Sequence, residues 1–260
     1  PFKWGTIWGS CQREQVALSM AIQDFRKSTR FVMFETDVAG WEYATHGGTA
    51  FIVDFDGLPY GVICKHCFGD FDWRQLAITD SRFGSAIAGL DSIYYPTSPV
   101  RDSVGSDVMD IAVIRFANDV QLPFFHGDAF VVRADTVTTS SFGDELAVSG
   151  ALKEKSKIDD EVISPTFALL GLADGGSTSA DPAIRTAIAE YHSLDFASLA
   201  GLSGSPVFNL TRRALCGVVV RGNIIEGRAR LWYVDFSDVL EVLRAVHGGR
   251  TEVAYSKTVL

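Results

Sequence analysis

The chain has 260 residues, a formal net charge of -9 and a sequence pI of about 5.0. The length allows one large all-β unit or two domains of ordinary size, and the hydrophobic residues, 47% of the total, suffice for a substantial core. The acidic balance argues against nucleic acid as a partner and against anchoring to an anionic membrane. No apolar run reaches membrane-spanning length, so we expect a globular protein whose partners are neither nucleic acids nor membranes.

The first part of the chain predicts a helix followed by β-structure. Residues 11–27 place apolar side chains near one face of a helix, and the apolar run 31–34 is rich in β-formers. Residues 49–55 and 59–64 predict a β-hairpin, because an Asp-Gly turn signal separates them. Further strands are predicted at 76–78, 85–90, 111–116, 129–132, 145–150, 166–170, 207–209, 215–220 and 230–234.

Four other stretches have a distinct character. The charged stretch 153–161 predicts a solvated hairpin tip, and the composition of 174–179 predicts a flexible loop. Residues 181–191 predict a short helix with an Asp-Pro start. Residues 237–247 predict a terminal helix capped by Ser237. Because the strands are short and separated by Gly, Asp and Ser, the pattern indicates an all-β barrel or sandwich.

Ser203 lies in the sequence Gly-Leu-Ser-Gly-Ser-Pro at 201–206. The glycines let the backbone bend tightly and bring its N–H groups close to whatever the serine touches. Taken alone, the stretch is more typical of a surface turn. A serine hydroxyl is a weak nucleophile that needs a base and a group to orient that base, so the reading depends on the partners that the chain supplies.

His66 and Asp110 are the candidate partners. His66 follows the predicted strand 59–64, and a base at a strand end is held rigidly while it faces solvent. Taken alone, it is more typical of a structural histidine. Asp110 opens an apolar strand, where a carboxylate must find hydrogen-bond donors such as a histidine ring N–H. Asp102 and Asp107 are alternatives, of which Asp107 has the setting of a turn residue.

The chain resembles the chymotrypsin-like (trypsin-like) serine peptidase family in the order of His66, Asp110 and Ser203. The catalytic triad of that family also follows the order His, Asp, Ser along the chain. The motif Ile-Cys-Lys-His-Cys is similar to the family's Thr-Ala-Ala-His-Cys, and Asp-Ile-Ala-Val-Ile is close to its Asp-Ile-Ala-Leu-Ile. Gly-Leu-Ser-Gly-Ser-Pro corresponds to Gly-Asp-Ser-Gly-Gly-Pro, in a form that looks like viral and bacterial members. The resemblance covers roughly residues 47–245.

This resemblance implies an all-β fold of two antiparallel β-barrels with an N-terminal helix and a C-terminal helix. The expected parts are an N-terminal helical extension at 1–30, a first barrel at 31–120, a second barrel with the terminal helix at 129–247, and a tail at 248–260. The form of the serine motif indicates a bacterial-type member. The mature Ile-Val-Gly-Gly terminus of zymogen-activated members is absent, so activation by a buried terminal amine is not expected.

The implied activity is hydrolysis of peptide bonds in a protein or peptide substrate, through an acyl-enzyme and without a cofactor. His66 is the expected base, and Asp110 holds its ring tautomer. The backbone N–H groups of Gly201 and Ser203 form the expected oxyanion hole. The alternative is a catalytically silent or latent pseudo-peptidase that serves as a protein-binding module. An α/β-hydrolase is disfavoured, since the Gly-x-Ser-x-Gly spacing and the order Ser, Asp, His are both missing.

The same resemblance predicts the substrate pocket. The family's pocket floor lies about six residues before the serine, which here is Ala197, and an uncharged floor favours apolar or small side chains over Arg or Lys. Asp195, close by, would reverse that preference after a small shift in alignment. Val220, Arg221 and Gly222 resemble the strand that pairs with extended substrate. Arg221 is either a contact for acidic substrate residues or a solvent-facing side chain.

The chain has four cysteines, and we expect their thiols to be reduced. No export signal is found, so we expect a cytoplasmic protein. Cys67 lacks the cysteine partner that many secreted family members have. Cys64, His66 and Cys67 resemble part of a zinc set, but a structural site needs a second ligand pair downstream, and His66 cannot also serve as a base. No metal is therefore expected.

Overall fold

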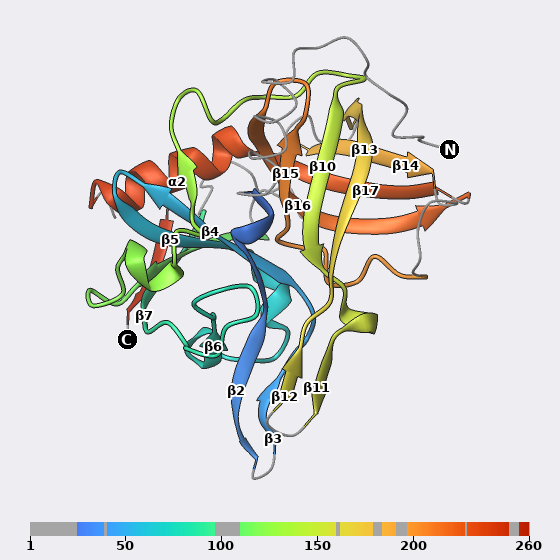
Figure 1. Ribbon diagram of the computed structural model, residues 1–260. Coiled ribbons are helices and arrows are strands. Elements are labelled where there is room, and N and C mark those ends of the chain that lie inside the picture. Colours follow the sequence, from blue (N-terminus) through green and yellow to red (C-terminus); the bar gives the residue numbers. More distant parts are fainter. Residues whose placement is uncertain are drawn as a thin grey trace.

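Antiparallel β-strands form most of the structure, a computed structural model in which two β-regions lie side by side (Figure 1). It describes residues 25–38, 41–96, 110–159, 162–178, 184–190, 197–226, 228–249 and 255–259. The helix predicted at 11–27 lies outside these residues except for 25–27, which are helical.

Strands from the first half of the chain, joined by the C-terminal strand β18, form a seven-stranded sheet. Its main path runs in the order β1 (Thr29–Phe31), β4 (Thr49–Phe55), β5 (Leu58–Cys64), β8 (Ile111–Phe116), β7 (Leu90–Pro96) and β18 (Tyr255–Val259), and β9 (Phe130–Val132) pairs in parallel with β4. The predicted hairpin of β4 and β5 is confirmed, and its turn residues Asp56 and Gly57 have φ values of 51° and 82°. The path has two ends, so the closure of a first barrel stays a prediction.

Two smaller sheets accompany the first half (Figure 1). One contains β3 (Trp41–Ala44), β2 (Met33–Val38) and β6 (Leu76–Ala77), and the other is the hairpin of β11 (Lys157–Asp159) and β12 (Val162–Ser164). The hairpin tip predicted at 153–161 is confirmed only in part, because residues 153–155 form the 3-10 helix η5 (Lys153–Lys155) and the hairpin itself extends to Ser164. The residues of its turn, 160 and 161, lie outside the described residues. Both sheets contribute to one apolar cluster around Met33, against which Tyr43, Ile158 and Ile163 pack.

Six strands of the second half close into a barrel. Their order around it is β10 (Glu145–Ala151), β13 (Phe167–Ser177), β14 (Ile184–Glu190), β17 (Arg228–Asp235), β16 (Ala214–Ile225) and β15 (Pro206–Asn209). Its core is apolar, with Val148, Val219 and Leu231 fully buried. The buried carboxylate of Asp174 pairs with Arg185 at 2.8 Å, which compensates a charge that would be costly to bury alone.

The C-terminal helix α2 (Phe236–His247) follows β17 and covers the core of the first sheet. Its buried Phe236 lies 6.3 Å from Phe51 of β4, measured between ring centroids. The cap is Asp235, whose side chain accepts a hydrogen bond from the backbone N–H of Ser237, so the predicted cap Ser237 was wrong. Three further 3-10 helices are η1 (Lys65–Phe68), η2 (Trp73–Gln75) and η4 (Leu122–Phe125).

Two predictions in the second half were wrong because long-range pairing overrides local signals. The helix predicted at 181–191 is instead β14, whose β-branched residues Ile184, Thr186 and Ile188 recur with the period of a strand. The loop predicted at 174–179 is largely the end of β13. A register shift between Asp174 and Gly176 absorbs the glycines there as a β-bulge.

Three boundaries also differ from expectation. Residues 129–132, predicted to begin the second half, supply β9 to the first sheet. Residues 85–90, predicted as a strand, contribute a single bridge between Ile87 and Thr79 before β7 begins. The segment 248–260, expected as a tail, supplies β18 at the edge of the first sheet. Among the described residues, none of the helices combines the length and the apolar character needed to cross a membrane.

Candidate active site

The register between β5 and β8 brings His66 and Asp110 together. Cys64, the last residue of β5, pairs with Ile111, the first residue of β8, in an antiparallel ladder. The chain that leaves β5 and the chain that enters β8 therefore lie side by side, and His66 follows the one while Asp110 precedes the other. The local sequence explains this arrangement, because residues 60–64 pair with residues 111–115 and the polar residues beside the paired apolar runs meet at one edge.

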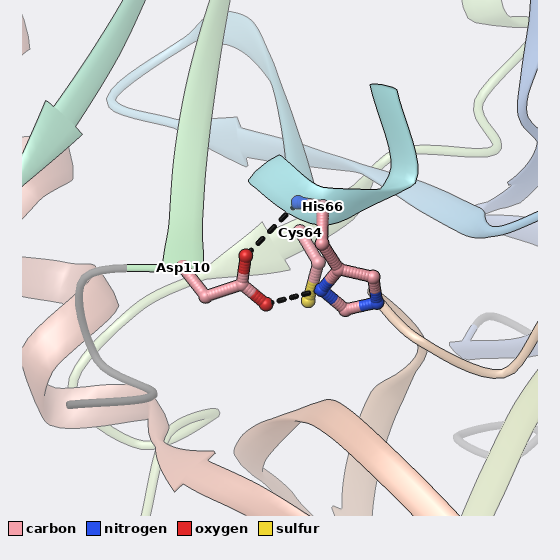
Figure 2. A group of neighbouring side chains, drawn as sticks. All are labelled: Cys64, His66 and Asp110. Carbon is pink, nitrogen blue, oxygen red and sulfur yellow. Dashed lines mark hydrogen bonds and ion pairs between the residues drawn. The ribbon is translucent and has the colours of Figure 1, made fainter. Parts of the chain in front are cut away.

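Asp110 holds both the backbone and the ring of His66 (Figure 2). One carboxylate oxygen accepts a hydrogen bond from the backbone N–H of His66 at 2.9 Å, and the other contacts the ring Nδ1. The side chain of His66 is 47% exposed, and that of Asp110 is 24% exposed. A carboxylate in this position fixes the ring orientation and keeps the proton on Nδ1, so Nε2 is left as a proton acceptor.

The loop that carries Ser203 is tied to the same edge of the first sheet. Thr49, at the start of β4, donates its backbone N–H to the carbonyl of Ser203 and its hydroxyl to the carbonyl of Gly201, each at 2.8 Å. The thiol of Cys67, next to His66 in the chain, lies 3.7 Å from the carbonyl oxygen of Ser203. Because Ala50 pairs with Ile63, the start of β4 adjoins the end of β5, and the loop lies against the edge that bears His66.

The hydroxyl of Ser203 donates to the carbonyl of Val220 at 3.3 Å. Ser203 itself is partly exposed, whereas both glycines of the loop are buried. Ser205, where the family usually has a second glycine, is fully buried, and its hydroxyl has no hydrogen-bond partner among the described residues. The two serines of the motif thus differ in environment, and Ser203 is the one placed to meet solvent or substrate.

The predicted oxyanion donors have a suitable backbone arrangement. The carbonyl of Ala200 accepts from the N–H of Lys153 at 2.9 Å, and the carbonyl of Leu202 accepts from the N–H of Ser205 at 3.0 Å. In a trans peptide the N–H points away from the carbonyl, so the N–H groups of Gly201 and Ser203 point away from these partners. Within the described residues, neither of these two N–H groups has an acceptor.

Glycine is required at two positions of this loop. Gly201 has φ +99°, and a Cβ there would lie 2.6 Å from the carbonyl oxygen of Ala151. Gly204 has φ +83°, and a Cβ there would lie 1.9 Å from the carbonyl oxygen of Thr49. Both contacts are with backbone atoms that cannot swing away, so the close docking of the loop depends on these glycines.

We expect the substitution Gly204→Ala to lower the free energy of unfolding by about 2–5 kcal/mol, since it adds a steric clash to an unfavourable φ. Gly57→Ala is the matched control, because Gly57 has φ +82° but nothing within 4 Å of its Cβ position. The control retains only the φ penalty of about 1–2 kcal/mol. Urea unfolding of the two variants checks this, and equal losses would show that the loop does not dock against Thr49 as described.

A cavity of about 320 Å³ lies beside Ser203. Three of the four predicted substrate-binding residues line it, namely Ala197, Arg221 and Gly222. Val220 is not among the lining residues, and it is buried with its carbonyl bound to the Ser203 hydroxyl. The remaining lining residues are Ser198, Leu199, Ala200, Asn223 and Ile224.

The cavity wall carries one charged side chain, Arg221, among its lining residues. Its guanidinium lies 5.3 Å from the ring centroid of Trp232 on the neighbouring strand β17, which accounts for its orientation. A Cβ on Gly222 would lie 2.6 Å from Leu231, so glycine lets the cavity wall pack closely on β17. Asp195, Asp102 and Asp107 lie outside the described residues.

Sequence reasoning gave no role to Thr49, and it did not place the Cys64 thiol beside Asp110. Thr49 is fully buried and links the Ser203 loop to β4 through two hydrogen bonds. A signal for it existed, since a threonine that follows Gly-Gly and opens an apolar strand is a polar residue at a core position. Cys64 is buried, and its thiol donates to the carbonyl of Val219 at 3.2 Å. The sequence singled out Cys64 only as part of an incomplete zinc set with His66 and Cys67.

Comparisons with known proteins bear on the fold. No protein-family model matches the sequence, and no curated protein sequence matches it. An inactivated protease paralogue from the scabies mite is 15% identical, with a TM-score of 0.61 over 88% of this chain and 97% of that one. A thermostable serine protease from an extremophilic microorganism is 13% identical, with a TM-score of 0.55 over 84% and 95% of the two chains.

This chain has the chymotrypsin-like protease fold. The likeness extends over nearly the whole of both solved structures, so the all-β architecture predicted from the sequence is confirmed at this level. At these identities the comparison concerns the fold alone. The chemistry has to be argued from the side chains of this chain.

Proposed function

We propose that the protein is a serine endopeptidase that cleaves peptide bonds through an acyl-enzyme formed on Ser203. The observation that carries the proposal is the contact of Asp110 with the ring of His66, at the edge to which the Ser203 loop is tied. Base, orienting carboxylate and nucleophile are the three parts that acyl transfer at a serine requires. They come from three separate segments of the chain.

In the proposed mechanism, Asp110 accepts from Nδ1–H of His66, which leaves the lone pair of Nε2 available. The Ser203 hydroxyl leaves the carbonyl of Val220, transfers its proton to Nε2 and attacks the substrate carbonyl. The imidazolium then gives that proton to the departing amine, and a water molecule repeats the sequence to release the acid. Hydrogen bonds to serine nucleophiles commonly tighten only when substrate is bound, so the present hydroxyl contact is compatible with this role.

The N–H groups of Gly201 and Ser203 stabilise the oxyanion in this mechanism. The carbonyl groups of Ala200 and Leu202, which belong to the same two peptides, accept hydrogen bonds from other backbone N–H groups. These bonds fix the orientation of both peptides, so the two N–H donors point to the opposite side. Preorganised donors of this kind need no rearrangement when charge develops on the substrate oxygen. Loss of one such donor typically costs about 10²–10³ in rate.

The fold does not by itself decide between an active peptidase and a binding module. The scabies mite protein has a similar fold and is described as inactivated. The alternative of a pseudo-peptidase that binds proteins therefore has to be separated by experiment. The presence of His66, Asp110 and Ser203 together in this chain supports the catalytic proposal.

Finer features of the proposal rest on the sequence. The protein is proposed to be a bacterial-type member, to contain two β-barrels, and to reside in the reducing environment of the cytoplasm. The three described cysteines, Cys64, Cys67 and Cys216, are free thiols, which supports a reducing compartment. No disulfide is needed to hold the described fold, since its barrel core is extensively apolar.

We expect cleavage after small or apolar residues, and little cleavage after Arg or Lys. The floor residue Ala197 offers no counter-charge, and Arg221 on the same cavity repels a cationic side chain. Digestion of a mixed peptide library, with the products identified by mass spectrometry, measures this preference. Ser203→Ala is the blank that removes contaminating proteases. Preferred cleavage after Arg or Lys would show that the floor is not Ala197.

A further inference from the structure

Cys64 joins His66 and Asp110 in a compact group of three different side chains. The sulfur of Cys64, a ring nitrogen of His66 and a carboxylate oxygen of Asp110 all lie within 4.8 Å of one another. Figure 2 shows the three side chains grouped together, with Nδ1 of His66 facing Asp110. The sequence predicted no metal because it offered Cys64 and Cys67 without a second ligand pair. The β5–β8 register brings in Asp110 as one further ligand, and with Cys64 and His66 it makes a group of three donors.

We propose that Cys64, His66 and Asp110 bind a zinc ion, and that this ion reversibly switches off the proposed peptidase. The inhibitory part of the inference rests on the proposed function, whereas the binding part does not. The ion is a regulator here and takes no part in catalysis. It competes with the catalytic arrangement of the same side chains.

The three donors suit zinc in type and in placement. Thiolate, imidazole and carboxylate bind zinc at about 2.3, 2.0 and 2.1 Å. Around a tetrahedral ion such donors are about 3.5 Å apart, so the group must open slightly where His66 and Asp110 now touch. Both of these side chains are partly exposed, which permits that movement and gives the ion a path from solvent. A water molecule completes the fourth position.

The charges balance when the ion binds. The Cys64 thiol releases its proton to solvent, and the resulting thiolate together with the Asp110 carboxylate neutralises the two positive charges of zinc. Burial raises the pKa of the Cys64 thiol, which opposes this step. A coordinating thiol is nevertheless deprotonated outright by the metal, so the burial lowers the affinity without preventing binding.

Inhibition follows from the two nitrogens of the imidazole ring. Zinc on Nδ1 takes the place of the proton that Asp110 now accepts. The neutral ring then carries its proton on Nε2, which becomes a donor. Nε2 cannot take the proton of Ser203 in that state, and Asp110 is engaged with the metal. Removal of zinc by a chelator restores the original tautomer and the activity.

The test is a titration of the chelator-treated full chain with zinc chloride by calorimetry, and with cobalt chloride by absorption. We expect one ion per chain and, with cobalt, a thiolate-to-metal charge-transfer band. Cys64→Ala lowers the affinity at least about 100-fold and removes the band. Cys64→Ser, which keeps the side-chain volume, does the same. Cys216→Ala, a buried thiol of the second barrel, retains both signals.

Cys67 is the competing ligand, because it directly follows His66 in the chain and its buried thiol lies 3.7 Å from the carbonyl oxygen of Ser203. We expect Cys67→Ala to retain binding and the absorption band. The inference is overturned if the unaltered chain shows no saturable zinc binding. It is also overturned if the Cys64→Ala variant binds zinc as tightly as the unaltered chain. It is equally overturned if Cys67→Ala loses binding while Asp110→Asn retains it, since the two cysteines alone would then hold the ion.

Activity assays separate this inference from the proposed function. If the zinc-free chain cleaves peptides and bound zinc does not inhibit it, the zinc switch is wrong and the peptidase stands. If zinc binds through Cys64 but the zinc-free chain never cleaves, the peptidase is wrong and the metal site stands. For each variant, the inhibition is expressed relative to its own zinc-free rate, and it should follow the measured zinc affinity.

Discussion

Replacement of Ser203 by alanine is expected to lower kcat by about 10⁶-fold. The hydroxyl is the group that forms the acyl-enzyme, and the methyl group of alanine cannot replace it. Substrate binding should persist, because the cavity beside Ser203 is otherwise unchanged. Rates of cleavage of the best library peptide, measured with the purified variant and the unaltered chain, give this ratio directly.

The matched control for this substitution is Ser205→Ala. Ser205 lies two residues away and is fully buried, with a hydroxyl that has no partner among the described residues. Removing an unpaired buried hydroxyl is expected to be neutral or slightly stabilising. The cleavage rate of Ser205→Ala should therefore stay close to that of the unaltered chain. A loss as large as that of Ser203→Ala would mean that Ser203 is not the nucleophile.

Asp110→Asn is expected to lower kcat by about 10⁴-fold at neutral pH. The asparagine keeps the size of the side chain and an oxygen for the backbone N–H of His66. Its amide group can donate to Nδ1, which favours the tautomer with the proton on Nε2 and so blocks proton transfer from Ser203. Stopped-time cleavage assays, paired with urea unfolding, separate this loss from any loss of stability.

A second Asp–His pair in the chain provides the control. Asp80 contacts Nε2 of His126 at 3.0 Å, and neither residue lines the cavity beside Ser203. Asp80→Asn removes the same charge from the same kind of pair and should leave the cleavage rate nearly unchanged. If the two substitutions reduce the rate equally, general electrostatics or folding explains the effect, and Asp110 has no special role.

Local patterns in the sequence were enough to predict the strands that position the base. β4, β5 and β8 occur where the apolar runs and the Asp-Gly turn place them. These strands are short, strongly apolar and clearly bounded, so pattern and structure agree. The contact between His66 and Asp110 follows from the register of β5 and β8, which the sequence could indicate only through the resemblance of the motifs.

The features that the sequence could not supply depend on distant partners. The helix signals at 181–191 are local, whereas β14 forms because β13 and β17 lie on either side of it. The pair of Asp174 and Arg185 stabilises this part of the barrel across two strands. Thr49 acquires its importance only when the Ser203 loop docks on it. Cys64 was weighed as a zinc ligand from the sequence, but the carboxylate that completes a three-donor group with it and His66 comes from Asp110, 46 residues away in the chain.

The central claim is that Ser203 is an activated nucleophile, and a fluorophosphonate probe tests it most directly. The probe forms a covalent bond with such a serine, and mass spectrometry of the digested protein locates the label. We predict labelling at Ser203 that is abolished in Ser203→Ala and greatly slowed in His66→Ala, because the base is then absent. No labelling of Ser203 in the zinc-free protein, or equal labelling in His66→Ala, would contradict the account.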